Sequence, residues 1–215
     1  IPPEKLPVGN GKKRTGRRLL TVGTDCSSGK KFTALALERD MKESAMNVDF
    51  RASGQTGIMI VGKGIPIDAV VADFITGAAE LLSPDNDPEH WDIIEGQGGI
   101  FHPGYGAVSM GLLLGSQPDA FVVCHDATRK YIEEWDNYVL PTIEEVIERT
   151  VLIGRLTNKE IRCVGVSMNS SQLNPKEGKK HLDDLSEKLQ LPCVDPIKEG
   201  TQKIIDYLNL EINNK

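Results

Sequence analysis

The stretch Leu19–Lys30 reads LLTVGTDCSSGK, and the helix-like stretch Phe32–Met41 follows it. An apolar run, a glycine-rich turn, a lysine and a helix, in this order, form the strand, loop and helix start of a phosphate-binding loop (P-loop). Successive backbone N–H groups of such a loop surround an anion, the helix N-terminus adds partial positive charge, and the lysine reaches the phosphates. We therefore expect the chain to bind a phosphorylated ligand through Gly23, Thr24, Asp25, Cys26, Ser27, Ser28, Gly29 and Lys30.

Two features of this loop depart from the common pattern. Five residues separate Gly23 from Gly29-Lys30, one more than in the common G-x-x-x-x-G-K. Lys31 then stands where a Ser or Thr hydroxyl normally holds Mg²⁺. We include Lys31 among the cofactor-binding residues and expect a loop that holds phosphate without cleaving or transferring it. The alternative is a glycine turn followed by a surface lysine.

The composition describes a soluble globular protein. The chain has 215 residues, 39% of them hydrophobic and 26% charged, and a net charge of −6, so it is long enough for one large domain. The acidic balance argues against a general nucleic-acid binder, and no apolar stretch is long enough to span a membrane. No signal peptide is visible. We expect a cytoplasmic protein without nucleic-acid or membrane partners.

The cysteines point to a reducing compartment. They show no C-x-x-C pairing, and three of them lie in apolar runs, which is typical of buried small hydrophobes: Cys26, Cys124, Cys163 and Cys193. Cys26 lies inside the P-loop, where a helix N-terminus could lower its pKa.

Residues 1–16 are rich in proline and glycine and show no periodic pattern, so we expect a linker or arm there and the domain over 17–215. A basic cluster ends this arm, and it is either a solvated leader or a source of positive potential for an anionic ligand or another domain: Lys12, Lys13, Arg14, Arg17 and Arg18. The chain begins at Ile1 without methionine, which is typical of a fragment or a processed product.

Strand-like and helix-like runs alternate after the arm. We expect strands at Leu19–Val22, Val48–Ala52, Trp91–Glu95, Ala120–His125, Arg162–Met168 and Pro192–Val194. Helices are expected near Phe32–Ser44, Ala69–Leu82, Val108–Leu114, Thr142–Leu152, Lys176–Leu189 and Thr201–Leu208. This alternation predicts a three-layer α/β domain with a parallel sheet, like that of P-loop NTPases. Its ligand should lie at the carboxyl ends of the strands.

The run Ala69–Leu82 is apolar on nearly every face of a helix. Such a helix is buried in a core or in an interface. We interpret Asp68 as its N-cap and expect the helix to be a core or dimer-contact element, which predicts a homo-oligomer.

Polar residues follow four of the expected strands, where parallel strands bring them together. Glu95 ends one strand at the position where P-loop proteins carry a second acidic residue, which suits Mg²⁺ if Mg-ATP is the ligand. His102, in the glycine-rich loop that follows, is a candidate acid or base near neutral pH, or an ordinary loop histidine. Asn169 suits a purine edge or a pantetheine amide. We expect further substrate contacts from Gln55, Thr56, Gln97, Tyr105 and Arg129.

Two resemblances follow from these motifs. GTDCSSGK and IIEGQGG, at Gly23–Lys30 and Ile93–Gly99, are similar to the loop and strand end of dethiobiotin synthetase. The segments GQTGIMIVGKGIPIDAVVADFITGAAE, EGQGGIFHPGYGAVSMGLLLGSQPDA and PCVDP cover most of the domain. They resemble the C-terminal P-loop domain of a family long catalogued as being of unknown function, whose characterised members are D-glutamate N-acetyltransferases.

The second resemblance implies an N-acetyltransferase. In that family the P-loop domain usually follows an N-terminal Rossmann-like domain, which this sequence lacks. The resemblance also implies acetyl-CoA as donor and a D-amino acid such as D-glutamate as acceptor. Coenzyme A carries a pyrophosphate and a further phosphate, so an anion-binding loop without the Mg²⁺ hydroxyl suits it.

On this hypothesis Lys30 and the loop backbone hold the coenzyme phosphates, and Glu95 or His102 takes the ammonium proton. Amides of the Gly96–Gly99 turn would stabilise the oxyanion. Two alternatives stay open. One is an ATP-dependent ligase or kinase in which Glu95 and Asp25 hold Mg²⁺, and the other is a nucleotide-sensing module without catalytic activity.

Overall fold

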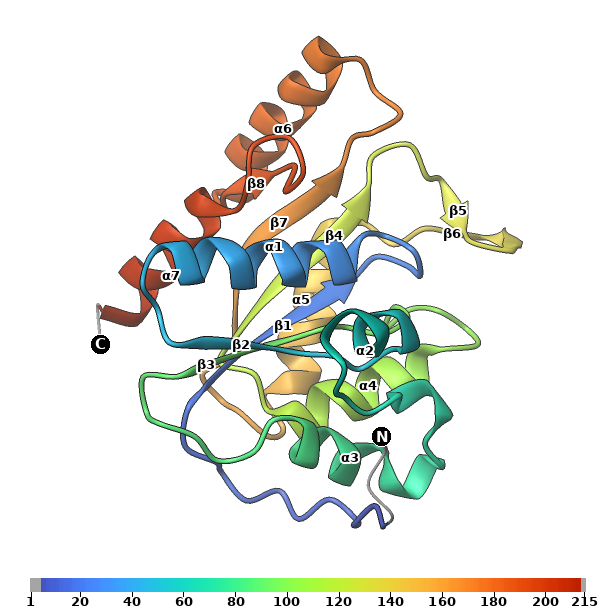
Figure 1. The fold of residues 1–215 in the computed structure, drawn as a ribbon. Helices are drawn as coiled ribbons and strands as arrows, with labels where there is room; N and C mark the ends of the chain where they lie inside the picture. Colours follow the sequence, from blue (N-terminus) through green and yellow to red (C-terminus); the bar gives the residue numbers. More distant parts are fainter. Residues whose placement is uncertain (1–4, 214–215) are drawn as a thin grey trace.

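The computed structural model describes residues 5–213. A six-stranded parallel sheet runs through it in the order β2-β3-β1-β4-β7-β8. These strands are β1 (Arg17–Gly23), β2 (Val48–Arg51), β3 (Trp91–Ile94), β4 (Ala120–Asp126), β7 (Arg162–Asn169) and β8 (Cys193–Val194). The helices are α1 (Lys30–Glu43), α2 (Gln55–Val61), α3 (Ile75–Leu82), α4 (Gly106–Ser116), α5 (Ile143–Gly154), α6 (Pro175–Leu189) and α7 (Gln202–Asn213). The expected three-layer fold and all six expected strands are confirmed (Figure 1).

Each strand presents alternate side chains to two separate cores, as the pleat of a β-strand requires. Leu19 packs with α1 and α7, while its neighbour Leu20 packs with α3 and α4 on the opposite face. Both leucines are almost fully buried. Helices α1 and α5 accordingly lie on opposite sides of the sheet in Figure 1. The sheet is therefore covered on both faces, which explains why its strands read as continuous apolar runs.

The parallel register places four strand ends at one edge. Gly23 at the end of β1 lies beside Cys124 of β4, which in turn lies beside Ser167 of β7. The chain leaves β1, β3, β4 and β7 at this edge, and the P-loop forms there.

The prediction of an α-helix over Ala69–Leu82 is wrong for the first half of this range. Two short 3₁₀ helices, Ile67–Ala69 and Ala72–Phe74, precede α3, and the chain between them is extended at Val70 and Val71. Adjacent β-branched residues favour this extended backbone. Asp68 therefore caps no α-helix: it lies within the first 3₁₀ turn, where no side-chain cap forms. Helix α2 and an antiparallel hairpin, β5 (Tyr131–Ile132) and β6 (Trp135–Val139), were not foreseen.

The described part of the arm, residues 5–16, packs against α3 and α4. The carboxylate of Glu80 accepts the backbone N–H groups of Asn10 and Gly11 at 2.9 and 2.8 Å. Arg14 donates to the carbonyl oxygens of Ser83 and Gly115, both at 2.7 Å. These contacts hold the arm on the domain.

The basic cluster does not serve the P-loop. Arg14 is 9% exposed and Arg18 is fully buried. Both donate to backbone carbonyl groups near the start of β1, at the opposite end of this strand from the P-loop. Neither the solvated leader nor the anion-steering interpretation holds for these two arginines, whereas Arg17 pairs with Glu89 at the surface.

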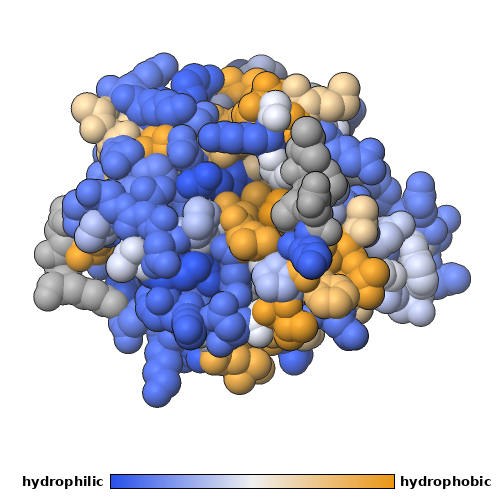
Figure 2. All heavy atoms as spheres, turned by 60° about the horizontal axis from the view of Figure 1, so that its bottom comes forward, coloured by the Kyte–Doolittle hydropathy of each residue, from blue (hydrophilic) through white to orange (hydrophobic). Residues whose placement is uncertain are grey.

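The surface around α3 is partly apolar. Figure 2 shows the face at the bottom of Figure 1, where hydrophobic side chains gather beside a mostly hydrophilic surface. Val71 before α3 and Leu81 within it are 66% and 44% exposed. Across residues 5–213, no helix has both the length and the apolar composition needed to cross a bilayer.

The contact between arm and α3 leaves no room for a side chain at Gly77, because a Cβ there would lie 1.9 Å from the carbonyl oxygen of Pro7. We expect Gly77→Ala to lower the free energy of unfolding by about 1–3 kcal/mol, as overpacking does. Denaturant titration measures the loss. Leu81→Ala, at an exposed position of the same helix, serves as the control. Equal stabilities of the two variants would contradict the close contact.

Candidate functional site

The P-loop has the conformation that its glycines predict. Gly29 adopts a left-handed conformation with φ of 99° and is the N-cap of α1, which begins at Lys30. A Cβ on Gly23 would lie 2.5 Å from Ser28 Oγ and 2.8 Å from Lys30 Nζ, so only glycine fits beside the lysine. At its start, the loop is tied to the sheet because Thr24 donates its N–H to the carbonyl of Cys124 at 3.0 Å.

Lys30 lies inside the loop. Its Nζ donates to the carbonyl oxygen of Asp25 at 2.6 Å and approaches Ser28 Oγ at 3.4 Å. Burial lowers the pKa of Lys30, since an ammonium group removed from water loses solvation. An anion in the loop would supply the opposite charge that Lys30 lacks.

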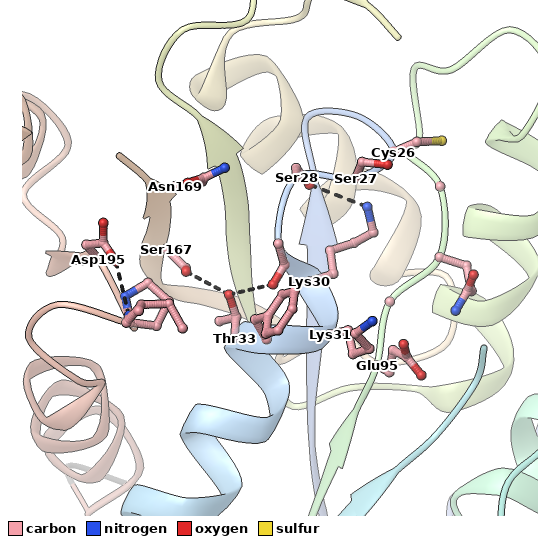
Figure 3. Close-up of a pocket in the computed structure, with 17 residues that line it drawn as sticks. Cys26, Ser27, Ser28, Lys30, Lys31, Thr33, Glu95, Ser167, Asn169 and Asp195 are labelled. Atoms are coloured by element: carbon pink, nitrogen blue, oxygen red, sulfur yellow. Dashed lines mark hydrogen bonds between the residues drawn. The ribbon is translucent and has the colours of Figure 1, made fainter. Parts of the chain in front are cut away.

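A cavity of about 590 Å³ opens over the P-loop. Residues of the loop and of α1, from Cys26 to Thr33, form its floor (Figure 3). Asn169 and Asp195 lie on one side of Lys30, and Lys31 and Glu95 on the other. The remaining walls are Gly96, Gln97, Gly98, Ser167, Pro196 and Ile197.

The side of the cavity near β7 and β8 is fixed by loop hydrogen bonds. Asn169 donates to Asp126 at 3.0 Å and accepts the N–H of Ser171. Asp195 accepts Ser170 Oγ at 2.5 Å and the N–H of Ile197 at 3.0 Å. This wall is rigid and offers amide, carboxylate and apolar groups. The role of Asp195 was missed, although the PCVDP segment that contains it is visible in the sequence.

Glu95 is buried at the other side. Its Oε2 accepts the backbone N–H groups of Ser53 and Gly54, both at 3.1 Å. Burial raises the pKa of Glu95, and these two N–H groups together with Lys31 and Lys30 offset only part of that effect. Within the described residues, Oε1 accepts no hydrogen bond, so this oxygen is available to a ligand.

The predicted substrate residues do not all reach the cavity. Gln97 lines it and donates to Ser53 Oγ at 2.8 Å. Gln55 and Thr56 are exposed at the start of α2. Tyr105 is half exposed. Among the turn amides, that of Gly96 donates to Thr21 Oγ1 at 3.0 Å and is already used. Within the described residues, those of Gln97, Gly98 and Gly99 donate no hydrogen bond.

Arg129 serves the loop itself. Asp25 is buried, and its Oδ2 accepts Arg129 Nη1 at 2.9 Å and the N–H of Glu133 at 2.7 Å. Its Oδ1 accepts the N–H of Cys26 at 2.7 Å. Because both oxygens are engaged by donors and one of these is cationic, Asp25 does not suit Mg²⁺.

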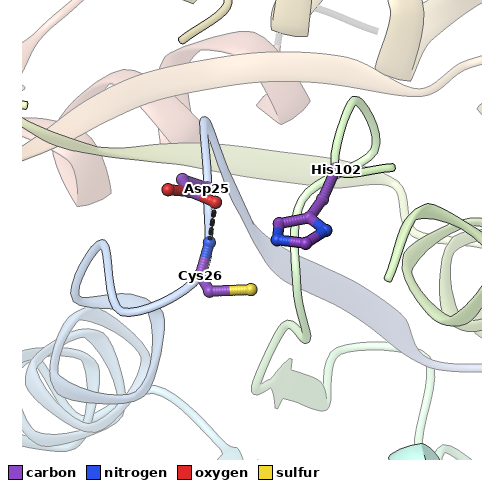
Figure 4. A group of neighbouring side chains, drawn as sticks. All are labelled: Asp25, Cys26 and His102. Atoms are coloured by element: carbon purple, nitrogen blue, oxygen red, sulfur yellow. Dashed lines mark hydrogen bonds between the residues drawn. The ribbon is translucent and has the colours of Figure 1, made fainter. Parts of the chain in front are cut away.

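His102 lies beside the loop, where its ring and the side chains of Asp25 and Cys26 converge within 4.8 Å (Figure 4). Its Nδ1 accepts the N–H groups of Gly104 and Tyr105 at 3.0 and 3.2 Å. A metal-bound histidine normally donates its other ring N–H to an acceptor. Since Nδ1 is an acceptor here and Asp25 is fully engaged, this cluster does not suit a metal ion.

Cys26 is not an activated thiol. Burial raises its pKa, against the expected effect of the helix N-terminus, and the nearby Lys30 offsets only part of the rise. All four cysteines are free.

Comparison with known proteins agrees with this geometry. Residues 7–205 match a family described as a domain of unknown function, the P-loop domain DUF1611_C. A D-glutamate N-acetyltransferase of a Pseudoalteromonas species is 50% identical over 207 residues, 96% of this chain and 62% of that protein. One from Tritonibacter scottomollicae is 43% identical over 208 residues, 97% of this chain and 62% of that protein. The chain thus spans less than two thirds of these relatives.

Solved structures show the same fold. A DUF1611 family protein from Anabaena variabilis matches with a TM-score of 0.91 and 31% identity, covering 98% of this chain and 62% of that one. A nucleotide-binding protein from Archaeoglobus fulgidus in complex with ADP matches with a TM-score of 0.54 and 14% identity, covering 92% and 87% of the two chains. At that identity the likeness concerns the fold alone. On the family match and the two curated relatives, the chain belongs to the DUF1611 family as its P-loop domain.

Proposed function

We propose that this domain binds acetyl-CoA and takes part in transferring the acetyl group to the amine of a D-amino acid such as D-glutamate. One observation carries the proposal: the cavity surrounds a buried P-loop lysine, Lys30, while the residue after it is a second lysine. Such a site attracts phosphate without supplying the hydroxyl that positions Mg²⁺ for phosphoryl transfer. The names of the two curated relatives support the same reaction.

The cavity offers one region for each part of coenzyme A. The loop amides and Lys30 would hold its phosphates. The wall at Asn169 and Asp195–Ile197 would take the adenine, since it offers polar groups beside apolar ones. The acyl arm would then extend toward Glu95, which lies on the other side of Lys30.

Glu95 is the proposed base. A carboxylate with a raised pKa accepts a proton more readily than an ordinary one, and Oε1 faces no competing donor among the described residues. The amine of the acceptor reaches the site as an ammonium ion, so Glu95 would take its proton before attack on the thioester. The amides of Gln97, Gly98 and Gly99 donate no hydrogen bond among the described residues, so they are the proposed donors to the reacting carbonyl.

A second candidate is an ATP-dependent ligase or kinase. Its support is structural: a cobyrinic acid a,c-diamide synthase from Mycobacterium smegmatis with bound ADP and magnesium shares the fold at a TM-score of 0.50 and 13% identity. This match covers 92% of this chain and 93% of that one. Glu95 Oε1 would be the ligand that this chain offers to Mg²⁺. The third candidate is a nucleotide-sensing module, in which the same site binds a nucleotide and catalyses no reaction.

Calorimetric titration with acetyl-CoA and with Mg-ATP separates these candidates. We expect acetyl-CoA to bind, and Lys30→Ala to weaken that binding at least tenfold, about 1.4 kcal/mol. Lys180→Ala removes the same charge from the exposed face of α6 and serves as the control. A folded Lys30→Ala variant with unchanged affinity would contradict the role of the P-loop. Tight binding of Mg-ATP alone would favour the ligase.

A substitution of Lys31 tests why the P-loop would bind a phosphate group without cleaving it. Lys31→Thr restores the hydroxyl, so it should increase the Mg²⁺-dependent affinity for ATP. Binding of acetyl-CoA should weaken by no more than about 1 kcal/mol, because the lost charge is partly solvated. Both ligands are titrated at fixed ionic strength, with and without Mg²⁺. Mg²⁺-dependent ATP hydrolysis by the wild type that Glu95→Gln abolishes would replace the acetyltransferase by the ligase.

Glu95 links activity to stability. Its pKa in the folded state lies above the ordinary value of 4.5, so deprotonation at neutral pH costs the folded state free energy. We expect Glu95→Gln to unfold at a higher temperature than the wild type at pH 7. This difference should vanish as the pH falls to 4.5 and below, where both states of the wild type are protonated. Acetyl transfer should fall by about 100-fold or more.

Thermal melts across pH measure the first effect and a transfer assay the second. Glu148→Gln, at an exposed position of α5, is the matched control and should change neither. A Glu95→Gln variant with full activity would remove Glu95 from the reaction.

We further propose a cytoplasmic homo-oligomer whose acceptor site is completed by an additional domain of the full-length protein, Rossmann-like in this family. The exposed apolar side chains at Val71 and Leu81 support association, and the 62% coverage of the curated relatives leaves length for such a domain. Light scattering at micromolar concentration should give a mass above the 23.6 kDa of this chain. A monomer mass would refute the oligomer.

A further inference from the structure

The ring of His102 is held from one side. His102 lies in the turn before α4, where its carbonyl accepts the N–H of Gly106 at 2.9 Å. Its Nδ1 accepts two backbone N–H groups, those of Gly104 and Tyr105. The rings of Tyr105 and Trp135 pack on the imidazole, with centroids at 4.5 and 5.8 Å. Rotation of the ring would break both hydrogen bonds to Nδ1.

These contacts decide which nitrogen carries the proton. A neutral imidazole has one donor and one acceptor nitrogen. A proton on Nδ1 would point at two N–H donors, so the neutral ring must carry its proton on Nε2. His102 therefore presents an N–H group, and not a lone pair, on its far side.

That N–H group faces the P-loop. Figure 4 shows one ring nitrogen of His102 turned toward Cys26 and Asp25 and the other turned away from them. Because Nδ1 is bound to its own loop, the nitrogen facing Cys26 is Nε2. Among the described residues no hydrogen bond engages Nε2, although His102 is only 3% exposed. Cys26 in turn lines the cavity over the P-loop.

The tautomer excludes the role of general base, which is one of the interpretations that the sequence leaves open for His102. An Nε2–H group cannot remove a proton from an ammonium ion or from Cys26. It can donate a fixed hydrogen bond to an oxygen that gains negative charge, and its loop bonds and ring contacts hold it in place before the reaction, as electrostatic stabilisation requires. A neutral histidine in triosephosphate isomerase donates to its substrate's carbonyl in this way.

We propose that His102 Nε2–H donates a hydrogen bond to the acyl carbonyl oxygen during acetyl transfer, an inference that rests on the proposed function. The amine nitrogen of the acceptor attacks the thioester carbon, a C–N bond forms, and the carbonyl π electrons move to the oxygen that Nε2–H faces. When this oxyanion collapses, the C–S bond breaks and its electron pair leaves on the coenzyme sulfur. By then Glu95 has passed to water the proton that it took from the ammonium ion. It takes a second proton from the attacking nitrogen and returns this one to the sulfur.

Cys26 stays a thiol in this reaction. His102 offers it an N–H donor and no base, so the proposal places no thioester on the protein.

Two substitutions separate the nitrogens of His102. The new amide oxygen in His102→Asn lies near the place of Nδ1, so this variant keeps the loop bonds and loses the Nε2–H donor. The new amide nitrogen in His102→Gln lies near the place of Nε2, so this variant keeps the donor and loses the loop acceptor. The two variants are assayed in the full-length protein, with Tm, KM for acetyl-CoA and kcat as readouts.

We expect His102→Asn to melt near the wild type with KM for acetyl-CoA within about twofold, while kcat falls about 100-fold, the usual effect of losing one oxyanion donor. His102→Gln should melt lower but keep kcat within about tenfold of the wild type. A purely structural histidine gives the reverse order, with His102→Asn active and His102→Gln inactive, and that result overturns the proposal. Nitrogen-15 NMR of labelled histidine reads the tautomer directly, and a proton found on Nδ1 also overturns it.

The outcomes distinguish a failure of the role of His102 from a failure of the proposed acetyl transfer. A wild type that acetylates a D-amino acid, with His102→Asn equally active, overturns only the role of His102. A wild type that binds acetyl-CoA but acetylates no amine removes the proposed function, and this role with it.

Discussion

The buried carboxylate of Asp25 is the contact on which the arrangement of the site depends. It joins three separate parts of the chain: the P-loop at Cys26, Arg129 after β4, and the turn of the β5–β6 hairpin at Glu133. An unpaired carboxylate at this depth would be unstable, and loss of one partner of a buried ion pair typically costs about 3–5 kcal/mol. The loop conformation and the position of the hairpin are therefore coupled.

This coupling extends to the imidazole ring of His102. The hairpin that Glu133 attaches to Asp25 carries Trp135, whose ring packs edge-on against His102. The same carboxylate thus fixes the P-loop and, through the hairpin, supports the ring that faces Cys26. Arg129 is better described as part of this support than as a substrate ligand, because its guanidinium is directed at Asp25 and at the carbonyl of Cys26.

Features set by local spacing were predictable from the sequence. Buried parallel strands and a glycine-framed loop leave strong local signals, so all six strands of the main sheet and the P-loop were found. The hairpin was not, because β6 is exposed along its whole length and shows no alternation of apolar and polar residues. Helix α3 was predicted too long, because Val70 and Val71 fit an apolar helix by composition while their backbone is extended.

Functional roles were harder to predict than positions, for a physical reason. Residue type and strand-end location singled out Glu95, Gln97 and Asn169, and all three line the cavity. The orientation of Arg129 depends on Asp25, more than a hundred residues away, and the tautomer of His102 depends on which ring nitrogen accepts backbone N–H groups. Neither relation can be recognised from the spacing of residues in the sequence.

The charges around the cavity explain what the site requires from a ligand. Lys30 is a buried cation with a lowered pKa, and Glu95 is a buried carboxyl with a raised one, so each carries a desolvation cost that the protein only partly offsets. A phosphate beside Lys30 and an ammonium ion beside Glu95 would each restore the missing counter-charge. The two groups lie on different parts of one cavity, with Lys31 near Glu95 and a rigid wall near Asn169. A ligand pair that is anionic at the loop and cationic at the strand end, such as a coenzyme thioester and an amino acid, would satisfy both groups at once. A nucleotide with Mg²⁺ would satisfy Lys30 and Glu95 as well, but its metal would then lie close to the cationic Lys31, which also acts on Glu95.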